Sequence, residues 1–124
     1  LVQDFRERTG IDAAFIANAQ PDGLTPERAT AVFRIAQESL SNIARHANAK
    51  SVDCSLESED GWLTLEIRDN GKGIGEDKIT GYESIGLLGM RERALAAGGE
   101  LVLESVAARG TIVTLRLPLA MEKA

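Results

Sequence analysis

Two pairs of segments with alternating apolar residues most restrict the fold of this 124-residue chain. Residues 51–58 and 62–69 form the first pair, and residues 100–106 and 111–117 form the second. A short turn that contains glycine separates the members of each pair. Alternation with a period of two is typical of half-buried strands, and such turns are typical of hairpins. The sequence therefore predicts two β-hairpins.

The remaining segments favour helices and one more strand. Thr25 provides a hydroxyl for a helix N-cap, and Pro26 follows where its missing N–H costs nothing. Helices and hairpins in this order predict an α/β (α+β) two-layer sandwich, in which helices cover one face of a mixed, mostly antiparallel sheet. The predicted elements outside the hairpins are a helix at 1–9, a strand at 11–17, a helix at 26–47 and a helix at 86–97 ended by Gly98 and Gly99.

Length and composition restrict the class of protein. The chain is expected to form one domain over residues 1–124, as part of a longer protein, with residues 119–124 as a frayed tail. Its net charge of −5 argues against a dedicated nucleic-acid surface, and no segment approaches the ~20 apolar residues of a membrane span. Cys54 is the only cysteine and is predicted to be a small core residue, which agrees with a reducing compartment.

One face of the predicted helix 26–47 carries polar groups beside an apolar stripe. Glu38, Asn42 and His46 are spaced four residues apart, so they share this face. A carboxylate and a carboxamide one turn apart suit a magnesium ion and a polyphosphate, because Mg²⁺ prefers oxygen ligands. They also suit an ordinary solvated helix face. The residues alone leave both interpretations open.

Asp69 is the most informative single residue. It continues the apolar alternation of strand 62–69, so its carboxylate is predicted to lie on the core face. A buried carboxylate needs donors, and the exocyclic amine of a purine would supply one. Gly71 and Gly73 would let the backbone approach a flat ligand closely. The alternative is an Asp-Asn-Gly turn that bonds to its own backbone.

A second glycine-containing stretch begins at Gly86 and includes Gly89. Its predicted place at a helix N-terminus would give it free N–H groups that attract phosphate, although the glycines could equally cap and pack the helix. The polar run 75–85 before it has no clear periodicity and is predicted to be a lid over a ligand. His46 could be a phosphoacceptor, a general base or a cation at a helix C-terminus.

Four motifs in this order resemble the ATP-binding domain of the GHKL superfamily, which includes sensor histidine kinases, gyrase B and MutL. They are Glu38-x-x-x-Asn42, Asp69-x-Gly71-x-Gly73, Gly86-x-x-Gly89 and Gly110-Thr111. The fuller forms, Gln37 to Ala47 and Gly86 to Arg93, are similar to the nitrate-sensor-type kinases of the NarX/DesK group. The resemblance implies the Bergerat ATP-binding fold, with ATP and Mg²⁺ as cofactors.

The resemblance also implies roles for individual residues. Asn42 would ligate Mg²⁺ beside Glu38, and these two residues would be the catalytic ones. Asp69 would accept a hydrogen bond from the adenine amine, and Thr111 would reach the adenine side through water. The remaining contacts with the cofactor would come from Arg45, His46, Lys50, Gly71, Gly73, Ile74, Gly86, Leu87, Gly89 and Met90.

The implied activity is that of a protein-histidine kinase, a transferase whose phosphoacceptor histidine lies on dimerisation helices absent from this chain. His46 occupies the family's Arg-His-Ala position rather than that of the acceptor. The implied partners are those helices in a homodimeric parent and a response regulator, with a cytoplasmic location even where the parent has a membrane anchor. The fragment alone would bind ATP with little activity. The alternatives are another GHKL ATPase, an anti-sigma Ser/Thr kinase, or an interaction module that binds no nucleotide.

Overall fold

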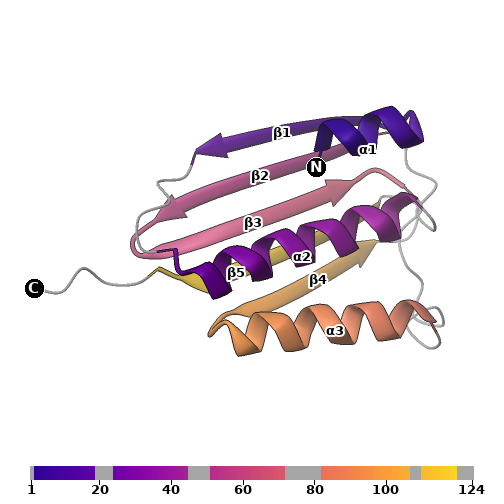
Figure 1. The fold of residues 1–124 in the computed structure, drawn as a ribbon. Coiled ribbons are helices and arrows are strands. Elements are labelled where there is room, and N and C mark those ends of the chain that lie inside the picture. The colour runs from indigo at the N-terminus through magenta and orange to yellow at the C-terminus, as the bar shows by residue number, and fades with distance from the viewer. Residues whose placement is uncertain (1, 19–23, 45–50, 72–81, 107–109, 120–124) are drawn as a thin grey trace, which may run out of the picture.

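The computed structural model describes residues 2–18, 24–44, 51–71, 82–106 and 110–119. Within these residues, the helices form one layer and the strands form the other (Figure 1). Their bounds are α1 Val2–Thr9, β1 Asp12–Asn18, α2 Pro26–Asn42, β2 Ser51–Glu59, β3 Trp62–Asp69, α3 Tyr82–Ala96, β4 Glu100–Val106 and β5 Gly110–Pro118.

The strands form one five-stranded sheet in the order β1-β2-β3-β5-β4. β1 pairs with β2 in parallel, and every other neighbouring pair is antiparallel. The β2–β3 and β4–β5 pairs are the two predicted hairpins. Figure 1 shows α1, α2 and α3 on one face of this sheet. The predicted two-layer sandwich with a mixed, mostly antiparallel sheet is therefore confirmed.

The core lies between the helices and the sheet. Ile35 of α2, Ala94 of α3 and Leu117 of β5 are fully buried there. Cys54 is also buried, as predicted, and burial raises the pKa of its thiol to about 11. That thiol stays protonated at neutral pH and acts as a small apolar side chain.

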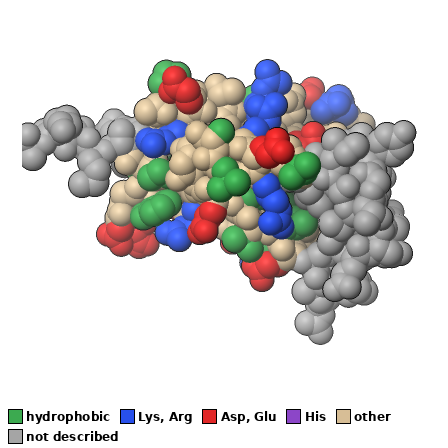
Figure 2. All heavy atoms as spheres, turned by 90° about the horizontal axis from the view of Figure 1, so that it is seen from below, with side chains coloured by type: hydrophobic (Ala, Val, Ile, Leu, Met, Phe, Trp, Pro, Cys, Tyr) green, Lys and Arg blue, Asp and Glu red, His purple; other side chains and the backbone are tan. Residues whose placement is uncertain are grey.

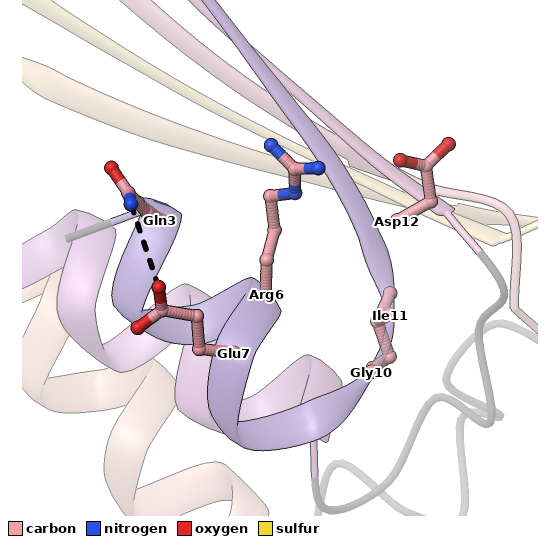
Figure 3. Close-up of a pocket in the computed structure, with 6 residues that line it drawn as sticks. All are labelled: Gln3, Arg6, Glu7, Gly10, Ile11 and Asp12. Atoms are coloured by element: carbon pink, nitrogen blue, oxygen red, sulfur yellow. Dashed lines mark hydrogen bonds between the residues drawn. The ribbon is translucent and has the colours of Figure 1, made fainter.

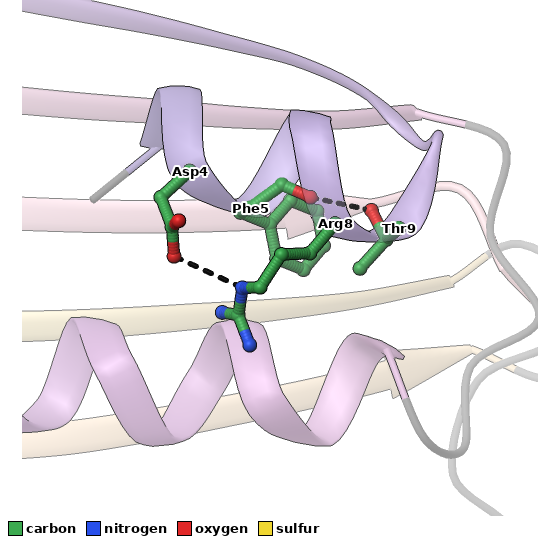
Figure 4. A network of polar contacts seen from close by, with 4 residues as sticks. All are labelled: Asp4, Phe5, Arg8 and Thr9. Carbon is green, nitrogen blue, oxygen red and sulfur yellow. Dashed lines mark hydrogen bonds and ion pairs between the residues drawn. The ribbon is translucent and has the colours of Figure 1, made fainter.

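Helix α1 packs on the sheet through Phe5, which is buried in the core (Figure 4). On its solvent side Arg8 pairs with Asp4 at 2.9 Å. The helix ends at Thr9, whose hydroxyl donates to the Phe5 carbonyl at 2.7 Å. Gly10 follows with φ +72°, the left-handed conformation expected of a helix C-cap glycine.

Helix α2 begins as predicted but its regular part ends earlier. The Thr25 hydroxyl accepts from the Arg28 N–H at 3.2 Å, and Pro26 is the first helical residue. The α-helix ends at Asn42, and Ile43 and Ala44 continue as a wider π-type turn. The predicted end at Ala47 lies outside the described residues.

Helix α3 corrects a prediction made from its glycines. It begins at Tyr82, whereas the sequence predicts a start at Gly86 after an irregular run. Residues 82–85 of the predicted lid are therefore helical, and the part of that lid before residue 82 lies outside the described residues. A glycine inside a helix costs only about 1 kcal/mol relative to alanine, so Gly86 and Gly89 do not mark a boundary. The end is as predicted, because Gly98 has φ +84° and the Gly99 N–H donates to the Ala94 carbonyl at 2.8 Å.

The surface on the α3 side carries side chains of all kinds. Figure 2, seen from below Figure 1, shows apolar, acidic and basic groups interspersed over its coloured part. Arg91, Glu92 and Arg93 follow one another along α3 and are exposed. Charges of both signs are therefore mixed on the described part of this face.

Gly110 fixes how closely β5 approaches the end of β3. Its φ is +105°, a conformation that favours glycine. A β-carbon placed there would overlap the carbonyl oxygen of Asp69 and lie 3.1 Å from the Asn70 α-carbon. Gly61, in the β2–β3 turn, has a similar φ of +82°, but a β-carbon there would meet nothing within 4 Å.

We expect Gly110→Ala to destabilise the fold more than Gly61→Ala. Both substitutions strain a positive φ at a cost of about 1 kcal/mol, but only the first forces two backbones apart, which adds about 1–3 kcal/mol. Urea unfolding of both variants measures the difference. Equal losses of unfolding free energy would mean that the backbone of β5 moves away from Asp69 without cost.

Candidate functional site

The residues singled out by the sequence come from element ends at one end of the molecule. The carboxyl ends of α2 and β3 and the amino ends of α3 and β5 lie on the right in Figure 1. β3 and β5 are antiparallel neighbours in the sheet, with Arg68 opposite Ile112. Asp69 and Thr111 are therefore the next residues beyond that pair, at the same end of the sheet. The fold thus gathers residues that are far apart in the sequence.

Asp69 has the predicted orientation toward the core, where it is 3% exposed. The Gly71 N–H donates to its Oδ1 at 2.8 Å, and the backbone N–H of Thr111 also donates to the carboxylate. Burial raises the pKa of Asp69 above its usual 3.8, and the two backbone N–H groups oppose that shift. The alternative prediction, an Asp-Asn-Gly turn in which the side chain bonds to its own backbone, is therefore also found here. An ordinary turn of this kind lies on the surface, whereas this carboxylate is buried.

Thr111 is the second notable residue here, and with Asp69, Asn70 and Gly71 it forms the corner of the sheet where β3 ends and β5 begins. Its residue is 5% exposed, and its hydroxyl oxygen has no hydrogen-bond partner among the described residues. A buried hydroxyl without a partner costs roughly 1–3 kcal/mol, so such atoms usually face a ligand or water. The hydroxyl of Thr111 and the carboxylate of Asp69 therefore suit a polar, flat ligand.

Asn70 was not singled out by the sequence, although it stabilises this corner. Its side-chain oxygen accepts from the Ser51 N–H at 2.9 Å, and its own N–H donates to the Ser51 carbonyl at 3.2 Å. These two bonds tie the end of β3 to the start of β2. They hold the backbone of Asp69 in place, because Asn70 follows it directly.

Glu38 and Asn42 lie one turn apart near the end of α2, as predicted, and both side chains are half-buried. Among the described residues, no group of three or more His, Cys, Asp or Glu side chains could hold a metal ion. Two oxygen-bearing side chains are compatible with Mg²⁺, which usually keeps several waters and completes its shell with phosphates.

The α3 residues predicted to contact the cofactor lie at a different position in their helix from the one predicted. Gly86, Leu87 and Gly89 lie inside the helix rather than at its N-terminus, which is at Tyr82. Met90 is buried at 2% exposure, and the Ser39 hydroxyl of α2 donates to its sulfur at 3.4 Å. This contact, which sequence reasoning missed, joins the two helices beneath the site. The predictions for Arg45, His46, Lys50, Gly73 and Ile74 lie outside the described residues.

A cavity of about 430 Å³ lies elsewhere, between α1 and the start of β1 (Figure 3). Gln3 and Glu7 on its helical wall bond to each other at 3.4 Å, and Figure 3 shows Arg6 pointing away from Glu7. Its lining contains no residue that the sequence singled out for the site. It is lined by Gln3, Arg6, Glu7, Gly10, Ile11 and Asp12.

Comparison with known proteins identifies a family. Residues 27–121 match the histidine kinase-, DNA gyrase B- and HSP90-like ATPases. The sensor histidine kinase MctS of Rhizobium johnstonii is 37% identical over 95% of this chain and 26% of its own length. The histidine-protein kinase/phosphatase DegS of Bacillus subtilis is 31% identical over 96% of this chain and 31% of its own length. The chain thus spans about a quarter to a third of these relatives.

The fold also matches a solved structure of similar extent. The crystal structure of the ATP binding domain of PrrB from Mycobacterium tuberculosis aligns with a TM-score of 0.73 at 21% identity, over 97% of this chain and 89% of that one. This likeness agrees with the predicted fold, and the sequence relatives confirm the resemblance to sensor histidine kinases. The chain therefore belongs to the family of histidine kinase-, DNA gyrase B- and HSP90-like ATPases, and the relatives it matches over nearly its whole length are sensor histidine kinases.

Proposed function

We propose that this chain is the ATP-binding catalytic domain of a two-component sensor histidine kinase, and that residues 1–124 form one such domain. The observation that carries the proposal is the buried Asp69 carboxylate beside Thr111, whose hydroxyl has no hydrogen-bond partner among the described residues. Asp69 stands at the carboxyl end of β3, in a chain whose relatives are histidine kinases. An adenine site of this kind would also suit another GHKL ATPase, and the histidine kinase relatives favour the kinase over those alternatives. The nucleotide-free module would leave the buried carboxylate without a use.

Asp69 and Thr111 would form the adenine end of the site. The Gly71 N–H holds one carboxylate oxygen of Asp69, which orients the group before any ligand arrives. Asp69 would then accept from the exocyclic amine of adenine, a bond that contributes on the order of 1.5–3 kcal/mol. The Thr111 hydroxyl would gain a partner on the base, directly or through water. Gly71 and Gly73 would lie against the base.

Asn42 and Glu38 would form the metal and phosphate end. Asn42 would bind Mg²⁺ through its amide oxygen, and Glu38 would orient water or metal beside it. Bound Mg²⁺ would neutralise phosphate charge. The predicted phosphate contacts of Arg45, His46 and Lys50, and those of Gly86, Leu87, Gly89 and Met90 from α3, complete this part of the proposal.

The reaction is a phosphoryl transfer, for which the chain would mainly supply position and charge neutralisation. The γ-phosphate of ATP passes to a histidine nitrogen on the parent's dimerisation helices, and ADP leaves. A response regulator then takes the phosphoryl group.

Among the described residues, no helix is both long and apolar enough to cross a membrane. We propose a cytoplasmic location for this domain.

Titration calorimetry with Mg-ATP tests the adenine end. Asp69→Asn is expected to weaken binding about ten- to a hundredfold, because its amide N–H₂ would face the adenine amine. The control is Asp60→Asn, which removes an exposed carboxylate from the turn at the other end of β3. Equal affinities for the parent and Asp69→Asn would remove the basis of the proposal.

A second prediction concerns the stability cost of the buried carboxylate. The pKa of Asp69 is raised in the folded state, so between 3.8 and that raised pKa the folded protein binds more protons than the unfolded one. The contribution of Asp69 to stability therefore falls as pH rises through this window, and Asp69→Asn lacks the fall. Urea unfolding from about pH 4 to about pH 8 should show the variant gaining stability relative to the parent as pH rises. A difference independent of pH would contradict this prediction.

A third prediction separates the metal end from the base. Asn42→Ala is expected to lose most of the gain in ATP affinity that Mg²⁺ gives, while affinity for ATP without Mg²⁺ stays within about threefold of the parent. Gln37→Ala is the matched control, since Gln37 is an exposed amide on the same helix. Calorimetry with and without Mg²⁺ gives both values. An undiminished magnesium effect in Asn42→Ala would exclude that side chain as a ligand.

A further inference from the structure

An apolar groove of about 270 Å³ runs between α2 and the strands β1, β2 and β3. Every described residue that lines it has an apolar side chain or is Cys54. Phe15 of β1 and Phe33 of α2 are 49% and 50% exposed, although most of their neighbours in the groove belong to the core. The lining residues are Phe15, Ala29, Val32, Phe33, Ala36, Leu40, Cys54, Leu56, Leu65 and Ile67.

The described part of α1 covers only part of the strand beside it. α1 has eight residues and spans about 12 Å, whereas β1 has seven and spans about 23 Å. The chain reverses at Gly10, so α1 begins beside the middle of β1 and covers only the half that starts at Asp12 (Figure 1). The uncovered half lies beyond the amino end of α1 (Figure 1). Phe15 of β1 lines the groove there, opposite residues of α2 that run from Ala29 to Leu40.

The sequence before Phe5 has the spacing of an apolar helical face. Phe5 is buried in the core, and in a regular helix the residues three and four positions earlier in the sequence belong to the same face. In this sequence those residues, Val2 and Leu1, are both of apolar type. A helix continued along the same axis would lie in the groove, and about seven more residues would reach the end of β1.

We propose that, in the longer parent, a helix continuing α1 toward the amino terminus fills this groove, with apolar side chains packed on Phe15 and Phe33. This inference rests on the proposed function, in which the dimerisation helices precede the domain. The groove would then be the surface through which the preceding helical segment is joined to the ATP-binding domain. A change in the position of that segment would reach α2, the helix that carries Glu38 and Asn42.

Cysteine accessibility tests the proposal. In a Cys54→Ala background, Phe33→Cys places a single thiol in the groove, and Leu95→Cys places a control thiol on α3, where Leu95 is 70% exposed. Each variant is made in the 124-residue chain and in the longer parent, and the rate of maleimide modification is measured. We expect Phe33→Cys to react about tenfold or more slowly in the parent, and Leu95→Cys to react equally in both.

The other outcomes overturn the proposal. Equal rates for Phe33→Cys in both proteins would mean that the parent leaves the groove open. Protection of the 124-residue chain that grows with its own concentration would assign the groove to a second copy. Mg-ATP titration of both proteins runs alongside, so a failure to bind ATP with the thiol still protected contradicts only the proposed function.

Discussion

Burial of one carboxylate is the constraint on which this site depends. Asp69 ends a strand whose other inward side chains are apolar, so it can occupy the core face only where donors meet it. The donors are backbone N–H groups from Gly71 and from Thr111 on the neighbouring strand. Both sources are fixed by the fold rather than by flexible side chains. The carboxylate is thus oriented before a ligand arrives, at a cost in stability that only a function would maintain.

Three sets of contacts stabilise the backbone around Asp69 and the helices beside it. Gly110 lets β5 approach the Asp69 backbone, and Asn70 ties the end of β3 to Ser51. Beneath it, the bond from Ser39 to Met90 joins α2 to α3, so the two helices that flank the site pack as one layer. The proposed metal ligands Glu38 and Asn42 stand on the same helix as Ser39, with their backbone fixed by this packing.

The sequence predicts those features of the fold that depend on residues close together in the chain. Alternation with a period of two gave the hairpins and the inward orientation of Asp69, and local capping chemistry at Thr25 and Gly98 gave two helix ends. The predicted start of α3 at Gly86 is wrong, because a glycine inside a helix costs only about 1 kcal/mol and does not have to mark its end. Gly110 belongs to one of the motifs, but its close approach to Asp69 and the bonds of Asn70 to Ser51 are contacts between strands, and the groove is formed by three strands and α2. No local sequence pattern predicts such contacts between distant segments.

The order of strands has a consequence for folding. Each hairpin pairs residues that are close in the chain, whereas β3 and β5 join residues on opposite sides of α3. Closing such a distant pair costs more loop entropy, so it is expected to come late. Asp69 and Thr111 become neighbours only in that step. A chain with both hairpins formed but not yet joined would therefore lack the adenine corner, and nucleotide could stabilise only the completed sheet.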